Sequence, residues 1–244
     1  MGEIVGGNMK SRKKETPSQD IYDLEYYSNI KDSEDVKIVH DEALNLLKPA
    51  PNEKILDIGC GRGELVKRML GVGVNAFGID YSSAAVTIAK NVCGSGRIVR
   101  ANAIHLPFTN EKFDKIVLTD VVEHLDQEDL DKCLKEVKRV LKNDGVVLIH
   151  TPNKWGIFVN NLYKKIQHKN NNLSKNKSQR NKKSEETVVY HVNEQSPISL
   201  TRNLRKNGFK VEMWFGTRIS KKIPFRIRKR LIFLRGMWCV CKKR

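Results

Sequence analysis

The 244-residue sequence lacks the features that define secreted and membrane-spanning proteins. Its five cysteines form no C-x-x-C pair and no disulfide framework of the secretory kind, which favours a reducing compartment. The first residues include no apolar segment of the signal-peptide type, and Gly6 occupies the place where an N-myristoylation signal needs Ser or Thr. The longest uncharged apolar runs are too short to cross a bilayer. We therefore expect a cytoplasmic protein.

Aromatic residues are also scarce, at 7%, whereas hydrophobic residues make up 39% of the chain, as in globular proteins. A chain of this length can form one domain with a full core and an insertion. Residues 1–19 are polar and basic and predict a mobile tail, and residues 20–244 predict a single domain. Within it, residues 152–190 predict a basic, partly disordered insertion, because the Lys- and Asn-rich part cannot bury enough apolar surface to become ordered.

The net charge of +17 is unevenly distributed. Residues 154–244 carry 24 Lys and Arg and 4 acidic residues, whereas residues 1–153 carry 21 and 24. This asymmetry indicates either a polyanionic partner, such as nucleic acid or an anionic membrane surface, or a solvated basic face. Residues 218–235 predict a basic amphipathic helix, which either lies on a membrane interface or packs its apolar stripe against the sheet of the protein itself. The first alternative would allow peripheral contact with an anionic membrane.

One short stretch, residues 54–64, organises the rest of the chain and reads KILDIGCGRGE. Its apolar residues predict a buried strand, and its alternate glycines predict a tight turn whose backbone can approach a ligand closely. The spacing is G-x-G-x-G, and Glu64 stands where the dinucleotide fingerprint, counted from Gly59, requires its third glycine. Asp57 and Glu64 place negative charge beside this loop. That charge favours a cationic ligand over the pyrophosphate of a dinucleotide.

This stretch resembles motif I of the class I S-adenosylmethionine-dependent methyltransferases, whose cofactor carries a sulfonium and an ammonium group. Three later segments resemble further motifs of the family: VNAFGID at 74–80, FDKIVLTDVVEHL at 113–125 and LKNDGVVLIHTPN at 141–153. The resemblance extends over about residues 20–215. It implies an α/β, Rossmann-like, doubly wound and mostly parallel seven-stranded sheet with an antiparallel last strand. The alternation of strand and helix over 54–151 separately predicts a parallel sheet with ligands at the carboxyl ends of its strands.

The resemblance also implies the residues of a cofactor site. Asp80, 17 residues after Gly63, would accept the two ribose hydroxyls. Asn102 and Ala103 stand where the family usually has an acidic and a small residue at the adenine; Asn102 can accept from the exocyclic amine but lacks the charge. Aromatic residues of a leading segment can close over the cofactor in relatives, and the candidates here are Tyr26 and Tyr27. The implied cofactor-binding residues are Asp57, Gly59, Cys60, Gly61, Gly63, Asp80, Tyr81, Asn102, Ala103 and Asp120.

Candidate catalytic residues follow the fourth predicted strand. The sulfonium supplies the activation, so the protein must align donor and acceptor and, for a hydroxyl acceptor, remove its proton. His124 can act as a general base with Glu123 or Asp120 orienting it, or it can make a structural hydrogen bond at a helix start. The D-x-x-E-H pattern also resembles the metal-binding set of small-RNA 3′-end 2′-O-methyltransferases and of ubiquinone-pathway O-methyltransferases. It implies Mg²⁺ or Zn²⁺ held by Asp120, Glu123, His124 and His191.

Two helix boundaries carry clear signals. Ser196 and Pro197 predict the start of a helix that ends at Gly208. The apolar stripe from Leu130 to Leu141 predicts another helix, which stops at residues 143–145, Asn-Asp-Gly.

The sequence favours a methyltransferase that uses S-adenosylmethionine to methylate a hydroxyl of a small or lipid-like acceptor. One alternative is an RNA methyltransferase whose basic insertion and tail neutralise phosphates. A second alternative is a non-catalytic S-adenosylmethionine-binding subunit, which the intact Asp57, Gly59, Gly61 and Asp80 disfavour.

Overall fold

The computed structural model describes residue 27 and residues 34–158, 191–214 and 236–244. The predicted basic tail, most of the predicted insertion and all of the amphipathic segment 218–235 lie outside these residues. No helix in the described part of the chain is both long and apolar enough to cross a membrane.

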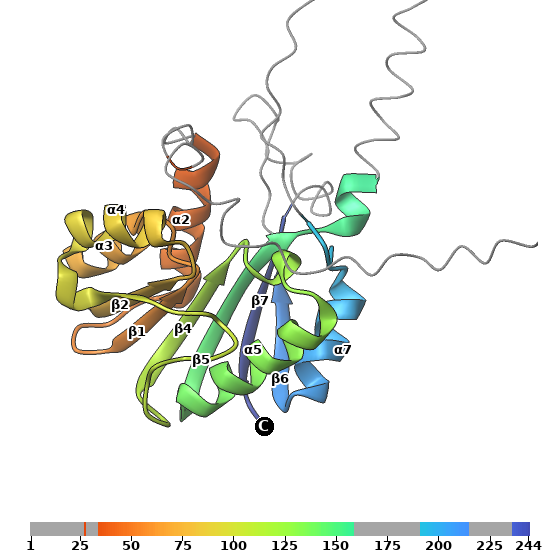
Figure 1. Ribbon diagram of the computed structural model, residues 1–244. Coiled ribbons are helices and arrows are strands. Elements are labelled where there is room, and N and C mark those ends of the chain that lie inside the picture. The colour runs from red at the N-terminus through yellow and green to blue at the C-terminus, as the bar shows by residue number, and fades with distance from the viewer. Residues whose placement is uncertain (1–26, 28–33, 159–190, 215–235) are drawn as a thin grey trace, which may run out of the picture.

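A seven-stranded sheet in the order β3-β2-β1-β4-β5-β7-β6 forms the centre of the molecule (Figure 1). Strand β7 runs antiparallel to both of its neighbours, and the other described pairings are parallel. The predicted fold class is therefore confirmed, including the antiparallel strand. The strands are β1 (Lys54–Ile58), β2 (Asn75–Asp80), β3 (Ile98–Arg100), β4 (Phe113–Thr119), β5 (Leu141–Pro152), β6 (Phe209–Trp214) and β7 (Gly236–Lys243).

Helices cover both faces of this sheet (Figure 1). Alternate residues of each strand point to opposite faces, so each buried strand contributes side chains to two separate hydrophobic cores. Leu148 of β5 packs in the core beneath α2, α3 and α4, and Ile149 packs in the core beneath α5 and α7. The helices are α2 (Glu34–Leu47), α3 (Glu64–Gly71), α4 (Ser83–Cys93), α5 (Gln127–Val140) and α7 (Pro197–Lys206), with short 3₁₀ turns η2 (Ser95–Arg97) and η3 (Val122–His124).

The start of α7 matches its sequence signals. The Ser196 hydroxyl accepts from the amide of Ser199, and the Ser199 hydroxyl accepts from the amide of Ser196, which completes a capping box. Pro197 occupies the first helical position, where its missing N–H is not needed. Gly208 follows the helix with φ +82°, a left-handed conformation that glycine adopts without strain.

The predicted end of the helix before β5 is wrong by three residues. Helix α5 ends at Val140, and Leu141 is already extended and paired with Phe113 of β4. Regular pairing resumes at Val146, so the Asn-Asp-Gly segment forms an irregularity inside a strand and does not end the helix. A Cβ at Gly145 would lie 2.6 Å from Leu141 Cδ1, so the glycine lets the chain turn past this buried side chain. Strand pairing outweighs the local stop signal here.

Candidate cofactor and active site

The glycine loop connects β1 to α3 at the carboxyl end of the sheet. The amides of Gly59 and Cys60 both donate to the Ile79 carbonyl at 2.9 Å, and the Gly61 amide donates to Asp80 Oδ2 at 2.9 Å. Gly59, Gly61 and Gly63 all have positive φ, at 73°, 53° and 82°. The loop is therefore held against β2 by its own amides, in a conformation that only glycine adopts readily.

Two of the three glycines are also sterically required. A Cβ at Gly59 would lie 2.4 Å from Val121 Cγ2, and a Cβ at Gly63 would lie 2.9 Å from Cys93 Sγ. The first contact places the loop directly against the chain that leaves β4. A Cβ at Gly61, in contrast, would meet only the ring of Tyr27, at 3.9 Å. Gly61 thus forms the part of the loop that a ligand can approach.

Asp57 is a buried carboxylate without compensation for its charge. It lies one residue before the end of β1, is 1% exposed, and its Oδ1 has no hydrogen-bond partner. Burial raises the pKa of Asp57 well above its usual value, and the nearby charges of Asp80 and Glu64 raise it further. A carboxylate in this position attracts a cation, because pairing would remove the cost of burying the charge.

Asp80, at the end of β2, is supported by backbone amides. Its Oδ1 accepts from the Ser82 amide and its Oδ2 from the Gly61 amide, both at 2.9 Å. Burial raises the pKa of Asp80, although the amides of Ser82, Gly61 and Tyr81 partly oppose that shift. Each carboxylate oxygen can accept a second hydrogen bond. Its predicted role at a ribose stays a prediction, and the geometry leaves acceptor capacity for it.

Most of the remaining predicted cofactor residues lie in the glycine loop or shortly after β2 and β3. Tyr81 follows β2 and is 43% exposed. Asn102 follows β3, and its side-chain oxygen accepts from the Ile104 amide at 3.2 Å, so an adenine amine would share that oxygen. Ala103 packs at the edge of the core under α5. The Cys60 side chain is buried, and burial raises the pKa of its thiol, so Cys60 serves as a packing residue. Its amide donates to Ile79 and its carbonyl accepts from the Gly63 amide.

Of the two tyrosines predicted to close over the cofactor, the structure describes Tyr27. It is buried and packs with Ala84 and Ala85 of α4, with its ring edge beside Gly61. Tyr26 lies outside the described residues.

The acidic residue after β4 pairs with a histidine that the sequence did not single out. Asp120 Oδ1 lies 2.8 Å from Nδ1 of His150, which is 1% exposed near the end of β5. The Asp120 amide donates to the carbonyl of the same histidine at 3.0 Å. Two links, one through the side chain and one through the backbone, therefore fix Asp120.

Glu123, His124 and His191 form a second cluster. Each offers one candidate ligand atom, and these atoms lie within 4.8 Å of one another. Glu123 is buried, and its Oε2 accepts from Thr151 Oγ1 at 2.9 Å; its carbonyl accepts from the amides of Val192 and Asn193. The rings of His124 and His191 meet edge to face at 5.2 Å. The structure thus brings together three of the four residues predicted to hold a metal.

The fourth residue, Asp120, is not part of this cluster, because its partner and the partner of Glu123 point to opposite faces of β5. His150 and Thr151 are adjacent in β5, so their side chains point to opposite faces of the sheet. His150 binds Asp120 on the face of Trp238, and Thr151 binds Glu123 on the face of Ile149. Sequence spacing alone did not separate the two acids.

Comparison with known proteins identifies the family of the central part of the chain. Residues 56–149 match the family of the methyltransferase domain. The domain belongs to the class I S-adenosylmethionine-dependent methyltransferases. An uncharacterized protein of Methanocaldococcus jannaschii is 34% identical to the chain over 177 residues, which are 68% of this chain and 65% of that protein. The ubiquinone biosynthesis O-methyltransferase of Pelagibacter ubique is 36% identical over 110 residues, 44% of this chain and 45% of that protein. The chain thus spans about half to two thirds of these curated relatives.

The fold of the methyltransferase domain also matches solved structures. The crystal structure of a SAM dependent methyltransferase from Archaeoglobus fulgidus has 20% sequence identity and a TM-score of 0.58, and the match covers 85% of this chain and 94% of that one. At 20% identity this similarity shows a shared fold and not a shared function. S-adenosylmethionine is the cofactor that the family and its fold imply, and the unpaired carboxylate of Asp57 fits its cationic ammonium group.

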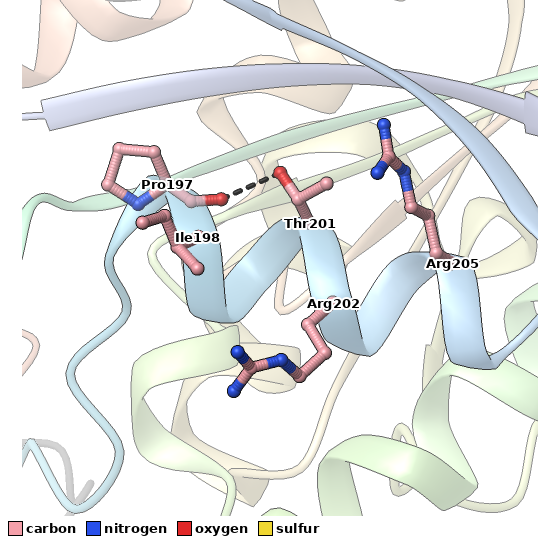
Figure 2. A pocket seen from close by; sticks show the side chains of 5 residues that line it. All are labelled: Pro197, Ile198, Thr201, Arg202 and Arg205. Atoms are coloured by element: carbon pink, nitrogen blue, oxygen red, sulfur yellow. Dashed lines mark hydrogen bonds between the residues drawn. The ribbon is translucent and has the colours of Figure 1, made fainter.

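The protein also has a surface groove on α7 that contains none of the predicted site residues. Figure 2 shows its lining, in which the Thr201 hydroxyl donates to the Pro197 carbonyl at 2.6 Å. Arg202 and Arg205 extend from the same helix and are exposed. The groove is formed by surface side chains of one helix, so we place the chemistry at the strand ends. Its lining residues are Pro197, Ile198, Thr201, Arg202 and Arg205.

Proposed function

We propose that this protein transfers the methyl group of S-adenosylmethionine to a hydroxyl of a small or lipid-like acceptor. The observation that carries the cofactor half of this proposal is the buried Asp57 carboxylate beside a glycine loop whose left-handed turns bring bare backbone to the ligand. A dinucleotide would bring phosphate charge to a site that is already negative, which electrostatics opposes. A cationic methyl donor removes the conflict.

Each part of the cofactor has a matching group in this site. Asp57 would pair with the ammonium, Asp80 would accept the ribose hydroxyls, and the Gly61 backbone would contact the methionine portion. When bound, the sulfonium supplies an activated methyl group. The protein's contribution is to hold the acceptor oxygen in line with it and to receive a proton.

The acceptor half of the proposal rests on the cluster of Glu123, His124 and His191. A hydroxyl needs help to lose its proton near neutral pH. Glu123 and His124 of this cluster follow β4, and Val121 of the same segment contacts the position of Gly59. His124 and Glu123 therefore remain our candidates for orienting and polarising the acceptor. The name of the Pelagibacter relative, an O-methyltransferase, supports a hydroxyl acceptor.

The same cluster fits a divalent metal. Two imidazoles and one carboxylate form a common donor set for Zn²⁺ and Fe²⁺ with open positions for an added ligand. The bond from Thr151 would orient the carboxylate, as outer-shell partners do at metal sites. A metal here would supply Lewis acidity to a hydroxyl oxygen.

The test of methyl transfer has two stages. We expect S-adenosylmethionine and S-adenosylhomocysteine to bind in calorimetry, and we expect labelled methyl to enter the small-molecule or lipid fraction of a cell extract. Label in the RNA fraction, together with RNA binding that weakens steeply with salt, would replace our acceptor with nucleic acid. Cofactor binding with no transfer to any fraction would favour a non-catalytic subunit.

The metal proposal makes a separate prediction. Glu123→Gln and His191→Gln should each lower the affinity for added Zn²⁺ at least 10-fold, measured by calorimetry on chelator-treated protein. The expected loss follows from the removal of one of three ligands and is of the size seen when even a supporting group is removed. Affinity for S-adenosylhomocysteine should stay within about 2-fold. Methyl transfer that survives exhaustive chelation unchanged would refute a catalytic metal.

A further inference from the structure

Asp120 has a backbone conformation that the fold must enforce. Its φ is +55°, in the left-handed region, which is uncommon for residues other than glycine, although Asp and Asn adopt it more often than other side chains do. Such a conformation persists where surrounding contacts over-determine a residue, and it concentrates at functional sites. The Asp120 side chain is 39% exposed, so its carboxylate can be reached from the site. The next residue, Val121, touches the position of Gly59. Asp120 thus immediately precedes the residue that contacts the cofactor loop.

The His150 ring that holds this carboxylate is itself fixed on every side. It packs on Trp238 with ring centroids 4.5 Å apart, and a Cβ at Gly236 would lie only 2.4 Å from Nε2. Register places His150 opposite Trp238 in the antiparallel β5–β7 pair. Glycine at 236 therefore makes room for an imidazole that any other residue would displace.

Trp238 is fixed in turn from the helix layer. Its Nε1 donates to Glu42 Oε2 of α2 at 2.7 Å, and its ring lies in the core beneath α2, α3 and α4. A continuous series of contacts therefore runs from α2 through β7 and β5 to the carboxylate after β4. Side chains that a second layer locks in this way hold a reactive group within narrow limits.

The arrangement also selects the tautomer of His150. Carboxylate oxygens of an ionised Asp120 only accept hydrogen bonds, so Nδ1 must carry the proton that it shares with Oδ1. Nε2 faces the Cα of Gly236, where a proton would have no acceptor in the described contacts. A neutral imidazole protonated on Nδ1 fits this pocket.

We propose that His150 is a positioning residue that holds Asp120 as the proton acceptor for hydroxyl methylation. This inference rests on the proposed function and deepens it. As the acceptor oxygen forms its bond to the methyl carbon, the carbon–sulfur bond breaks and its electron pair stays on sulfur, giving a neutral thioether. The hydroxyl proton passes to the Asp120 carboxylate. Atoms and charge balance without any further reactant.

The main test is Asp120→Asn, because it separates chemistry from structure. Asparagine has the same shape, and its amide oxygen can still accept from His150 Nδ1, but it cannot take up a proton. We expect the labelled-methyl transfer rate to fall about 10²–10⁴-fold, the usual contribution of a general base. Affinity for S-adenosylhomocysteine in calorimetry should stay within a few fold. The control, Asp41→Asn on α2, alters an exposed ion pair with Arg68 of α3 and should leave the rate unchanged.

His150→Gln tests the positioning role. It should lower the rate at saturating S-adenosylmethionine at least 10-fold with little change in KM for that donor. If Asp120→Asn does not fold, Asp120→Glu takes its place: the carboxylate is then kept but displaced, and the rate should fall with donor affinity intact. An Asp120→Asn protein that folds and transfers methyl at the wild-type rate would overturn the proposal.

Histidine ¹⁵N spectra give a readout that does not depend on any acceptor. His150 should appear as the neutral Nδ1–H tautomer, assigned by the signal lost in His150→Gln. An Nε2–H tautomer would overturn the positioning geometry, whatever the transfer assay shows. If the wild-type protein methylates nothing in the extract, the proposed function fails and the base role fails with it. A reduced rate in the variants of an active protein bears on the present inference alone.

Discussion

Asp57→Asn is expected to remove S-adenosylmethionine binding and, at the same time, to stabilise the ligand-free protein. Removing one partner of a buried charge pair costs about 2–5 kcal/mol, which corresponds to a loss of affinity of at least about 30-fold. In the absence of ligand the same carboxylate destabilises the folded protein, because its Oδ1 is buried without a hydrogen-bond partner and the charges of Asp80 and Glu64 are near. An uncompensated buried polar group costs about 1–3 kcal/mol.

The stabilising effect of Asp57→Asn should depend on pH in a definite direction. Burial, and then Asp80 and Glu64, raise the pKa of Asp57 in the folded state above the unfolded value of about 3.9. Between these two pKa values the folded state binds more protons than the unfolded state, so stability falls as pH rises through that window. The penalty is absent below about pH 4. The advantage of the asparagine variant should therefore appear above about pH 4 and vanish below it.

Thermal unfolding of ligand-free protein measures this effect. A gain of 1 kcal/mol corresponds to about 2–4 °C in Tm for a chain of this size. Asp114→Asn is a control of opposite sign: burial opposes ionisation there, but Lys142 and the Lys54 amide outweigh it and lower the pKa of Asp114. That variant should lose stability at neutral pH and lose less at acid pH. A lower Tm for Asp57→Asn at pH 7, with ligand affinity retained, would contradict our interpretation of the site.

The glycine loop and its acidic residues could be predicted because the interactions that shape them involve residues close together in the sequence. A short apolar run, alternate glycines and an acid near the strand end predict a buried strand, a tight turn and a charge within eleven residues. The structure has strand β1 followed by a turn at these residues, with positive φ at all three glycines. The cap at Ser196 is equally local, and it formed as expected.

The partner of Asp120 could not be predicted in this way, since it depends on register across the sheet. His150 reaches Asp120 because Thr119 pairs with His150, and the ring is fixed by Gly236 and Trp238 from a strand inserted much later in the sequence. A histidine near the carboxyl end of the fifth predicted strand was the available signal. Its role appears only when β7 is placed beside β5.

Gly59→Ala is expected to destabilise the protein strongly and to displace the cofactor loop from β4. Alanine at φ +73° costs about 1–2 kcal/mol in backbone strain. Its Cβ would also lie 2.4 Å from Val121 Cγ2, closer than real Cβ contacts allow, so the loop or the segment after β4 must move. Overpacking of this kind typically costs a further 1–3 kcal/mol. We expect a total loss of about 3 kcal/mol and a fall in Tm of roughly 6–12 °C.

Gly73→Ala separates the two contributions to that loss. Gly73 has φ +81°, close to that of Gly59, but a Cβ there would meet nothing within 4 Å. Its variant should therefore show the backbone strain without the collision and lose about 1–2 kcal/mol, with S-adenosylhomocysteine affinity unchanged. In the double variant Gly59→Ala with Val121→Ala the collision is relieved, so part of the lost stability and affinity should return. If Gly59→Ala and Gly73→Ala lose equal stability and both retain ligand affinity, then close contact between the loop and β4 is not what shapes the cofactor site.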